Sequence, residues 1–125
     1  SISWLSSDDK EVTLRYLLET LGTEWGRDMV HKDLWTILAD RFVKACKSEY
    51  VLIDGVRFEN EAKWIESQGG MIISVYRPNY FDTSPAANHP SNIALDPRYA
   101  TWHFLNNEGL DELRQKVSWF VAENL

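Results

Sequence analysis

Hydrophobic residues recur at three- and four-residue steps in the first third of the chain, and this period predicts two amphipathic helices. Across residues 8–21 the apolar positions fall on one helical face. One of residues 6–8 is expected to cap the start of this helix, and Gly22 to end it. The same period returns across residues 31–47, with basic residues near the C-terminal end, where the helix dipole favours them.

Continuous apolar runs further along the chain predict buried strands. Residues 50–53 form such a run, typical of a parallel strand that is covered on both faces. Residues 58–68 regain the helical period and end at a pair of glycines. Residues 71–76 then predict a second buried strand. Together these segments predict a βαβ unit with a right-handed crossover.

The last third of the chain is expected to hold a long loop, one strand and one helix. Residues 77–98 are rich in Pro, Asn, Asp and Ser without a sustained period, and such loops are often functional, so this one is a candidate lid. Residues 101–105 predict a short strand, and residues 110–124 a closing helix. The alternation of strands and helices predicts one α/β domain over residues 1–125, built on an open parallel sheet.

Ligands bind at the carboxyl ends of the strands in such a sheet, and the predicted topology brings Asp54, Arg57 and Arg77 there. A carboxylate at a strand end can hold Mg²⁺ through water, and a guanidinium one turn later can grip a phosphate with two hydrogen bonds. The alternative interpretation is that Asp54 caps the next helix and that Arg57 pairs with Glu61 at the i+4 position.

Composition and charge narrow the class of protein. With 13 Lys and Arg against 19 Asp and Glu, the net charge is −6, which argues against a nucleic acid polymer as the partner. No apolar run approaches the roughly 20 residues that span a bilayer, and the first residues lack the pattern of a secretory signal. The single Cys46 excludes an internal disulfide. We therefore expect a cytoplasmic protein with no membrane partner.

Residues 15–24 read Arg-Tyr-Leu-Leu-Glu-Thr-Leu-Gly-Thr-Glu, which resembles the Arg-x-Leu-x-Gln-x-Leu-Gly-Thr-Asp/Glu stretch of phage-type deoxynucleoside monophosphate kinases. The turn from Asp54 to Arg57 is similar to the Asp-Gly-x-x-Arg turn of nucleoside monophosphate kinases. Further matches follow in the family's order over nearly the whole chain, namely Trp35, Glu61, Gly69-Gly70, residues 75–78, His89 and residues 107–109.

The resemblance implies transfer of a phosphoryl group from ATP, with Mg²⁺, to a deoxynucleoside monophosphate in the cytoplasm of a bacterial host. It implies catalytic roles for Asp54, Arg57 and Arg77, with Asp54 in the magnesium site and with Arg77 and His89 near the lid. The residues that it implies for the monophosphate pocket are Arg15, Glu19, Thr23, Glu24, Trp35, Arg57 and Glu61.

Several of these residues also have a structural interpretation. Arg15 could lie on a solvated helix face, and Trp35 could belong to the core, because aromatic residues at helical spacing usually pack. Arg27 and Asp28 could be an ordinary surface pair. His89, in a loop flanked by proline, could be structural.

Two positions depart from the family's pattern. Glu19 replaces the usual Gln, exchanging an amide for a carboxylate that only accepts hydrogen bonds. Asn92 stands in the acidic position of the family's His-x-Ser/Thr-Glu segment. The first departure bears on a contact with the base, the second on the lid.

The third departure is the largest, because the chain contains no Gly-x-x-x-x-Gly-Lys-Ser/Thr segment to cradle the phosphates of ATP. The implied fold is thus a P-loop nucleoside-monophosphate-kinase-like fold that lacks its first strand and its P-loop. Three alternatives stay open. The chain is the acceptor side of a longer kinase, or it is a shortened phage protein that binds nucleotides or other proteins without catalysis. The third alternative is a dimeric interaction module that uses Trp4, Trp102 and Trp119.

Overall fold

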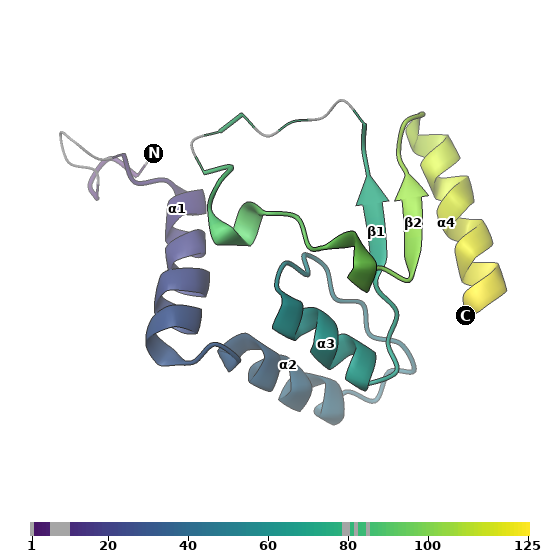
Figure 1. The fold of residues 1–125 in the computed structure, drawn as a ribbon, viewed down its shortest axis with the longest axis horizontal. Helices are drawn as coiled ribbons and strands as arrows, with labels where there is room; N and C mark the ends of the chain where they lie inside the picture. Colours follow the sequence, from purple (N-terminus) through teal and green to yellow (C-terminus); the bar gives the residue numbers. More distant parts are fainter. Residues whose placement is uncertain (1, 6–10, 79–80, 82, 85) are drawn as a thin grey trace.

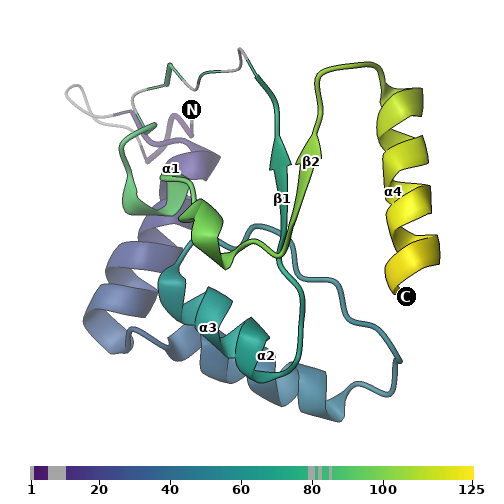
Figure 2. The ribbon, with the colours of Figure 1, turned by 45° about the vertical axis from the view of Figure 1, so that its right-hand side comes forward.

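The structure is a computed structural model that describes residues 2–5, 11–78, 81, 83–84 and 86–125 (Figure 1). One column of helix stands at one end of the molecule, two helices lie across its base, and a small sheet with the last helix forms the other end (Figures 1 and 2). The elements, in chain order, are α1 (Leu14–Glu19), the π-helix η1 (Thr20–Val30), α2 (Leu34–Ala45), α3 (Glu59–Ser67), β1 (Ile73–Tyr76), the 3₁₀ turns η2 (Pro90–Asn92) and η3 (Pro97–Tyr99), β2 (Trp102–Leu105) and α4 (Leu110–Asn124).

The first helix differs from its prediction at both ends. It starts at Leu14, where the Thr13 hydroxyl accepts the Tyr16 N–H at 3.1 Å, and the caps expected at residues 6–8 lie outside the described residues. It does not end at Gly22, because the chain continues as η1. At the end of η1 the His31 N–H donates to the carbonyl of Gly26, five residues earlier, at 3.0 Å.

The other predicted helices are confirmed to within a few residues, and α3 shows why its ends lie where they do. At its start the Glu61 carboxylate accepts the N–H groups of Arg57 and Phe58, at 2.8 and 3.0 Å. At its end Gly69 adopts a φ of +75°. The Gly69 and Gly70 N–H groups then bond to the Glu66 and Ile65 carbonyls, which completes a Schellman motif.

Strands β1 and β2 pair in parallel, with Ile73 opposite Trp102 and Tyr76 opposite Leu105. This confirms the parallel α/β class and two of the three predicted strands. The connection between them is the long predicted loop, which carries η2 and η3 and reaches across to α1 before returning to β2 (Figure 1).

The strand predicted at residues 50–53 is wrong for this structure, and so is the βαβ unit built on it. These residues are irregular and exposed, with Leu52 at 92% exposure. A strand needs a neighbour for its backbone hydrogen bonds, and none of the described residues pairs with this segment. β1 is also less buried than its apolar run predicted, since Val75 and Tyr76 are exposed.

Two clusters of side chains hold the described part together. Ala62, Ile65 and Ile72 form the core between α3 and the start of β1. A second cluster joins β2 to α4, where the Phe120 ring lies 5.3 Å from Trp102 and 5.6 Å from Phe104. Within the described ranges, every helix is too short or too polar to cross a membrane.

Candidate functional site

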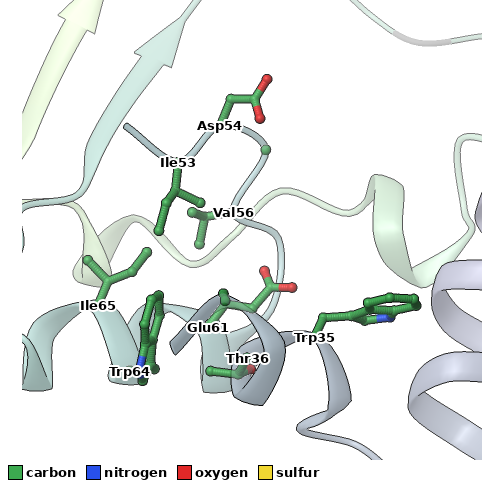
Figure 3. Close-up of a pocket in the computed structure, with 10 residues that line it drawn as sticks. Trp35, Thr36, Ile53, Asp54, Val56, Glu61, Trp64 and Ile65 are labelled. Carbon is green, nitrogen blue, oxygen red and sulfur yellow. The ribbon is translucent and has the colours of Figure 1, made fainter. Parts of the chain in front are cut away.

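A small hollow brings together three of the predicted site residues, Trp35, Asp54 and Glu61 (Figure 3). It lies between α2, α3 and the chain after residue 50, with a volume of about 160 Å³. Gly55, with a φ of +67°, makes the turn that follows Asp54. The hollow is smaller than the roughly 300 to 1,000 Å³ of most small-molecule pockets, so it has room for only a part of a larger ligand.

Within the hollow, Glu61 has a structural task. Its carboxylate accepts two backbone N–H groups at the start of α3, so it acts in place of the N-cap residue Phe58, whose side chain cannot accept a hydrogen bond. The alternative interpretation of this turn was that Asp54 caps α3 and that the Arg57 side chain pairs with Glu61. Both parts are wrong in detail, because Asp54 does not cap the helix and Glu61 bonds to the backbone N–H of Arg57.

Asp54 lies at the rim of the hollow, and its carboxylate points away from the aliphatic side chains of Ile53 and Val56 (Figure 3). No hydrogen bond or ion pair reaches this carboxylate from the residues that the structure describes. Those residues also contain no cluster of three or more metal-ligating side chains. A single carboxylate is compatible with Mg²⁺, which protein sites often hold through one or two carboxylates and the substrate's phosphates.

A second group of predicted residues joins α1 to the candidate lid. Glu19 accepts hydrogen bonds from Arg15 Nε at 2.9 Å and from Asn92 Nδ2 at 2.6 Å, and Arg15 Nη1 donates to Ser84 Oγ at 3.1 Å. Burial raises the pKa of Glu19, but the hydrogen bonds from Asn92 and Arg15 outweigh it, so the pKa lies below its ordinary value. Arg15 is thus held by partners although its side chain remains exposed, so the interpretation as part of a solvated helix face also fits.

The contact between Glu19 and Asn92 joins the two positions that depart from the family's sequence pattern. A carboxylate stands where the pattern has an amide, and an amide stands where it has a carboxylate. In this chain the amide of Asn92 donates to the carboxylate of Glu19, and this hydrogen bond attaches the loop to α1.

His89 makes a second attachment between the loop and the helical column. Its Nδ1 accepts the Ser91 backbone N–H at 3.2 Å, which requires an unprotonated Nδ1. The proton of the neutral ring is then on Nε2, which donates to Glu24 Oε1 at 2.8 Å. His89 and Glu24 are thus brought together by the structure, and the structural interpretation of His89 fits this contact.

Trp35 links the hollow to the helical column. Its indole N–H donates to the Gly22 carbonyl at 2.7 Å, and its ring lies against Gly26. Thr23, between these glycines, is buried, with 6% exposure. Trp35 is therefore packed against its neighbours, as the core interpretation states, and it also lines the hollow.

Asp54, Arg57 and Arg77 do not share one sheet edge as expected, because residues 50–53 form no strand. Arg77 directly follows β1 and does not line the hollow, and Arg57 precedes α3. Among the described residues, neither guanidinium has a hydrogen-bond or ion-pair partner.

Two further polar residues, Asn60 and Arg27, were not singled out as site residues by the sequence. Asn60 Nδ2 lies 3.2 Å from the Lys32 carbonyl, 2.9 Å from Asp33 Oδ1 and 3.2 Å from Thr36 Oγ1. Arg27 Nη1 donates to Asn60 Oδ1 at 2.9 Å, and Arg27 Cζ lies 3.7 Å from the centre of the Phe58 ring. No short-range signal predicts these contacts, because they join residues far apart in the sequence.

Comparison with known proteins gives a matching family and a matching relative, and both are named as monophosphate kinases that act on deoxynucleotides. A family model described as deoxynucleotide monophosphate kinase matches residues 2–117. The chain is 25% identical over 125 aligned residues to the deoxynucleoside-5'-monophosphate kinase of Escherichia phage T5, an alignment that covers 90% of this chain and 50% of that protein. The chain thus spans about half the length of this curated relative. No solved structure matches the chain significantly.

Proposed function

Because the chain belongs to the deoxynucleotide monophosphate kinase family, we propose that it forms the acceptor side of an enzyme that transfers a phosphoryl group from ATP to a deoxynucleoside monophosphate. The family match over residues 2–117 is the observation that carries this proposal. The hollow at Trp35 and Asp54, and the helix-to-lid contacts of Glu19 and Glu24, support it.

The proposed roles are positioning roles, since phosphoryl transfer depends mainly on alignment and on neutralising charge. Arg15 and Arg57 bind the monophosphate, and Asp54 contributes to the magnesium site. Glu19, Thr23, Glu24, Trp35 and Glu61 shape the pocket, Glu61 by fixing the start of α3. Arg77 and His89 belong to the lid, where His89 fastens the loop to η1.

The residues present here do not fit the phosphates of ATP, because the sequence has no glycine-rich loop whose N–H groups would receive them. We propose that a further strand, leading into such a loop, belongs between residues 51–53 and the free edge of β1. Among the described residues β1 pairs with β2 alone, and the backbone groups on its open edge favour an added strand at this position.

The second candidate function is a nucleotide-binding or protein-binding module without catalysis. Its supporting observation is the same exposed apolar surface, together with Trp4 and Trp119, which are exposed near the two ends of the chain. A module of this kind would bind a monophosphate or a protein partner in every longer form of the chain, and would never transfer a phosphoryl group.

Titration calorimetry with the four deoxynucleoside monophosphates tests acceptor binding. We expect weak binding that Arg57→Ala abolishes and that Arg57→Lys already weakens, because Lys cannot form the bidentate contact. Arg41→Ala is the matched control. Arg41 is exposed on α2 and lies about 200° around the helix from Ala39, which lines the hollow. Equal affinity in the wild type and in Arg57→Ala would remove Arg57 from the phosphate site.

A further inference from the structure

Arg27 is held in place by neutral groups. Its Nη1 donates to Asn60 at 2.9 Å, and the guanidinium carbon lies 3.7 Å from the centre of the Phe58 ring. Asn60 is itself fixed by the Lys32 carbonyl, Asp33 and Thr36, so it holds its acceptor oxygen toward Arg27. The guanidinium is therefore pre-organised by a stacking contact and by one hydrogen bond, which uses one of its five N–H donors.

Arg27 also differs from the paired arginines in its electrostatic surroundings. Arg15, Arg98 and Arg114 each have a carboxylate within ion-pair distance. Arg27 is half-buried, yet no carboxylate of the described residues lies within 4.0 Å of its guanidinium. A half-buried cation that is fixed in place and lacks an acidic partner is well suited to bind an anion.

The position of Arg27 indicates which anion. Phe58, under its guanidinium, directly follows Arg57 in the chain, and the two Cα atoms are about 3.8 Å apart. The Arg27 guanidinium, although it comes from η1, therefore lies beside the start of α3, and its partner Asn60 contacts Thr36, which lines the hollow with Asp54 and Trp35. Two guanidinium groups can together provide the forked donors that a phosphate dianion accepts.

We propose that Arg27 binds the phosphate of the acceptor monophosphate together with Arg57, and that Asn60 is the positioning residue that orients Arg27. This inference rests on the proposed function, since it assigns the phosphate ligand to the same site. In this proposal the Asn60 contacts, which join η1, α2 and α3, serve ligand binding because they orient Arg27.

The test compares Arg27→Met, which keeps an apolar stem over Phe58, with the control Arg41→Met. Calorimetry is done with the four deoxynucleoside monophosphates and with the deoxynucleosides that lack the phosphate. We expect Arg27→Met to weaken monophosphate binding by roughly ten- to a hundred-fold, as for the loss of a charged hydrogen bond, and to leave nucleoside binding unchanged. Arg27→Lys should lie between this variant and the wild type.

Unchanged monophosphate affinity in Arg27→Met overturns the inference and leaves the proposed function standing. Parallel losses of monophosphate affinity, nucleoside affinity and thermal stability would show a purely structural role and overturn it too. If the wild type binds no monophosphate, the proposed function fails. Titration with inorganic phosphate, followed by ³¹P NMR, then tests whether Arg27 binds an anion. Phosphate binding that Arg27→Met removes would support the anion site, and absence of phosphate binding would refute it.

Discussion

Trp35 and the two glycines of η1 show how single side chains set the geometry around the hollow. The indole N–H of Trp35 donates a hydrogen bond to the Gly22 carbonyl, and the ring occupies the space that a side chain at Gly26 would need. A Cβ at Gly26 would lie 2.7 Å from the Trp35 ring, whereas a Cβ at Gly22 would have no atom within 4 Å. Of the two, Gly26 has a steric reason to be glycine and Gly22 has none.

We predict opposite effects of Gly26→Ala and Gly22→Ala on the free energy of unfolding. Gly26→Ala should destabilise the protein by about 1–3 kcal/mol, because Trp35 must move out of its packed position. Gly22→Ala should be neutral or stabilise by up to about 1 kcal/mol, since alanine favours the helical backbone. Urea denaturation followed by Trp fluorescence measures both. Equal effects would show that Trp35 does not press on Gly26.

Glu61 gives a second prediction at this scale. Glu61→Ala leaves the Arg57 and Phe58 N–H groups without their acceptor, so it should lower the free energy of unfolding by about 0.5–2 kcal/mol, as for the loss of a helix cap. Glu66→Ala, at an exposed position near the other end of α3, is the control and should change stability much less. A Glu61→Ala variant of unchanged stability would contradict the capping role.

At the scale of elements, the loop after β1 is attached to the helical column through Glu19 and Glu24. The pKa of Glu19 is below its ordinary value in the folded chain, so its contribution to stability is present above the unfolded-state pKa. That contribution is lost as the pH falls through the folded-state pKa. The attachment of the loop to α1 should therefore weaken in acid.

We predict that the stability difference between the wild type and Glu19→Gln is largest near neutral pH. It should shrink as the pH falls below about 4.3, the ordinary pKa of a glutamate, because the wild-type carboxylate then takes up a proton. Thermal unfolding at a series of pH values measures this difference, with Glu66→Gln as the control. A difference that is constant with pH would show that ionised Glu19 does not stabilise the loop.

The elements also show what a sequence can and cannot predict. The helical period found α2, α3 and α4, because each period reflects one packed face, and the glycine pair marked the end of α3. The apolar run at residues 50–53 gave a false strand, because a run records the tendency to be buried and does not supply the neighbouring strand. Of the residues that the sequence implied for a site, Trp35, Asp54 and Glu61 line one hollow. Asn60 was not predicted, because its contacts come from residues 24 to 33 positions away.

At the scale of the whole molecule, the apolar surface and the family match lead to the same proposal. Residues 51–53 and β1 carry exposed aliphatic side chains, although soluble domains usually cover such strand-forming segments. The chain spans half the length of the relative from phage T5. A strand added between these segments would pair with the open backbone edge of β1, and a glycine-rich loop after it would provide the missing donors for ATP.

We predict that residues 1–125 alone show no ATP-dependent phosphorylation of a deoxynucleoside monophosphate, and that a version extended ahead of residue 1 by a strand and a glycine-rich loop does. Loss of a single transition-state donor typically costs a factor of about 10² to 10³ in rate, and here the N–H donors and the lysine of that loop are all missing from the sequence. Hydrogen exchange gives a readout that is independent of activity. Exchange at residues 51–53 and 73–76 should slow in the extended version, while exchange in α4 should stay the same. Robust activity of residues 1–125, with contaminating host kinase excluded by an Arg57→Ala control, would show that another segment of this chain holds ATP.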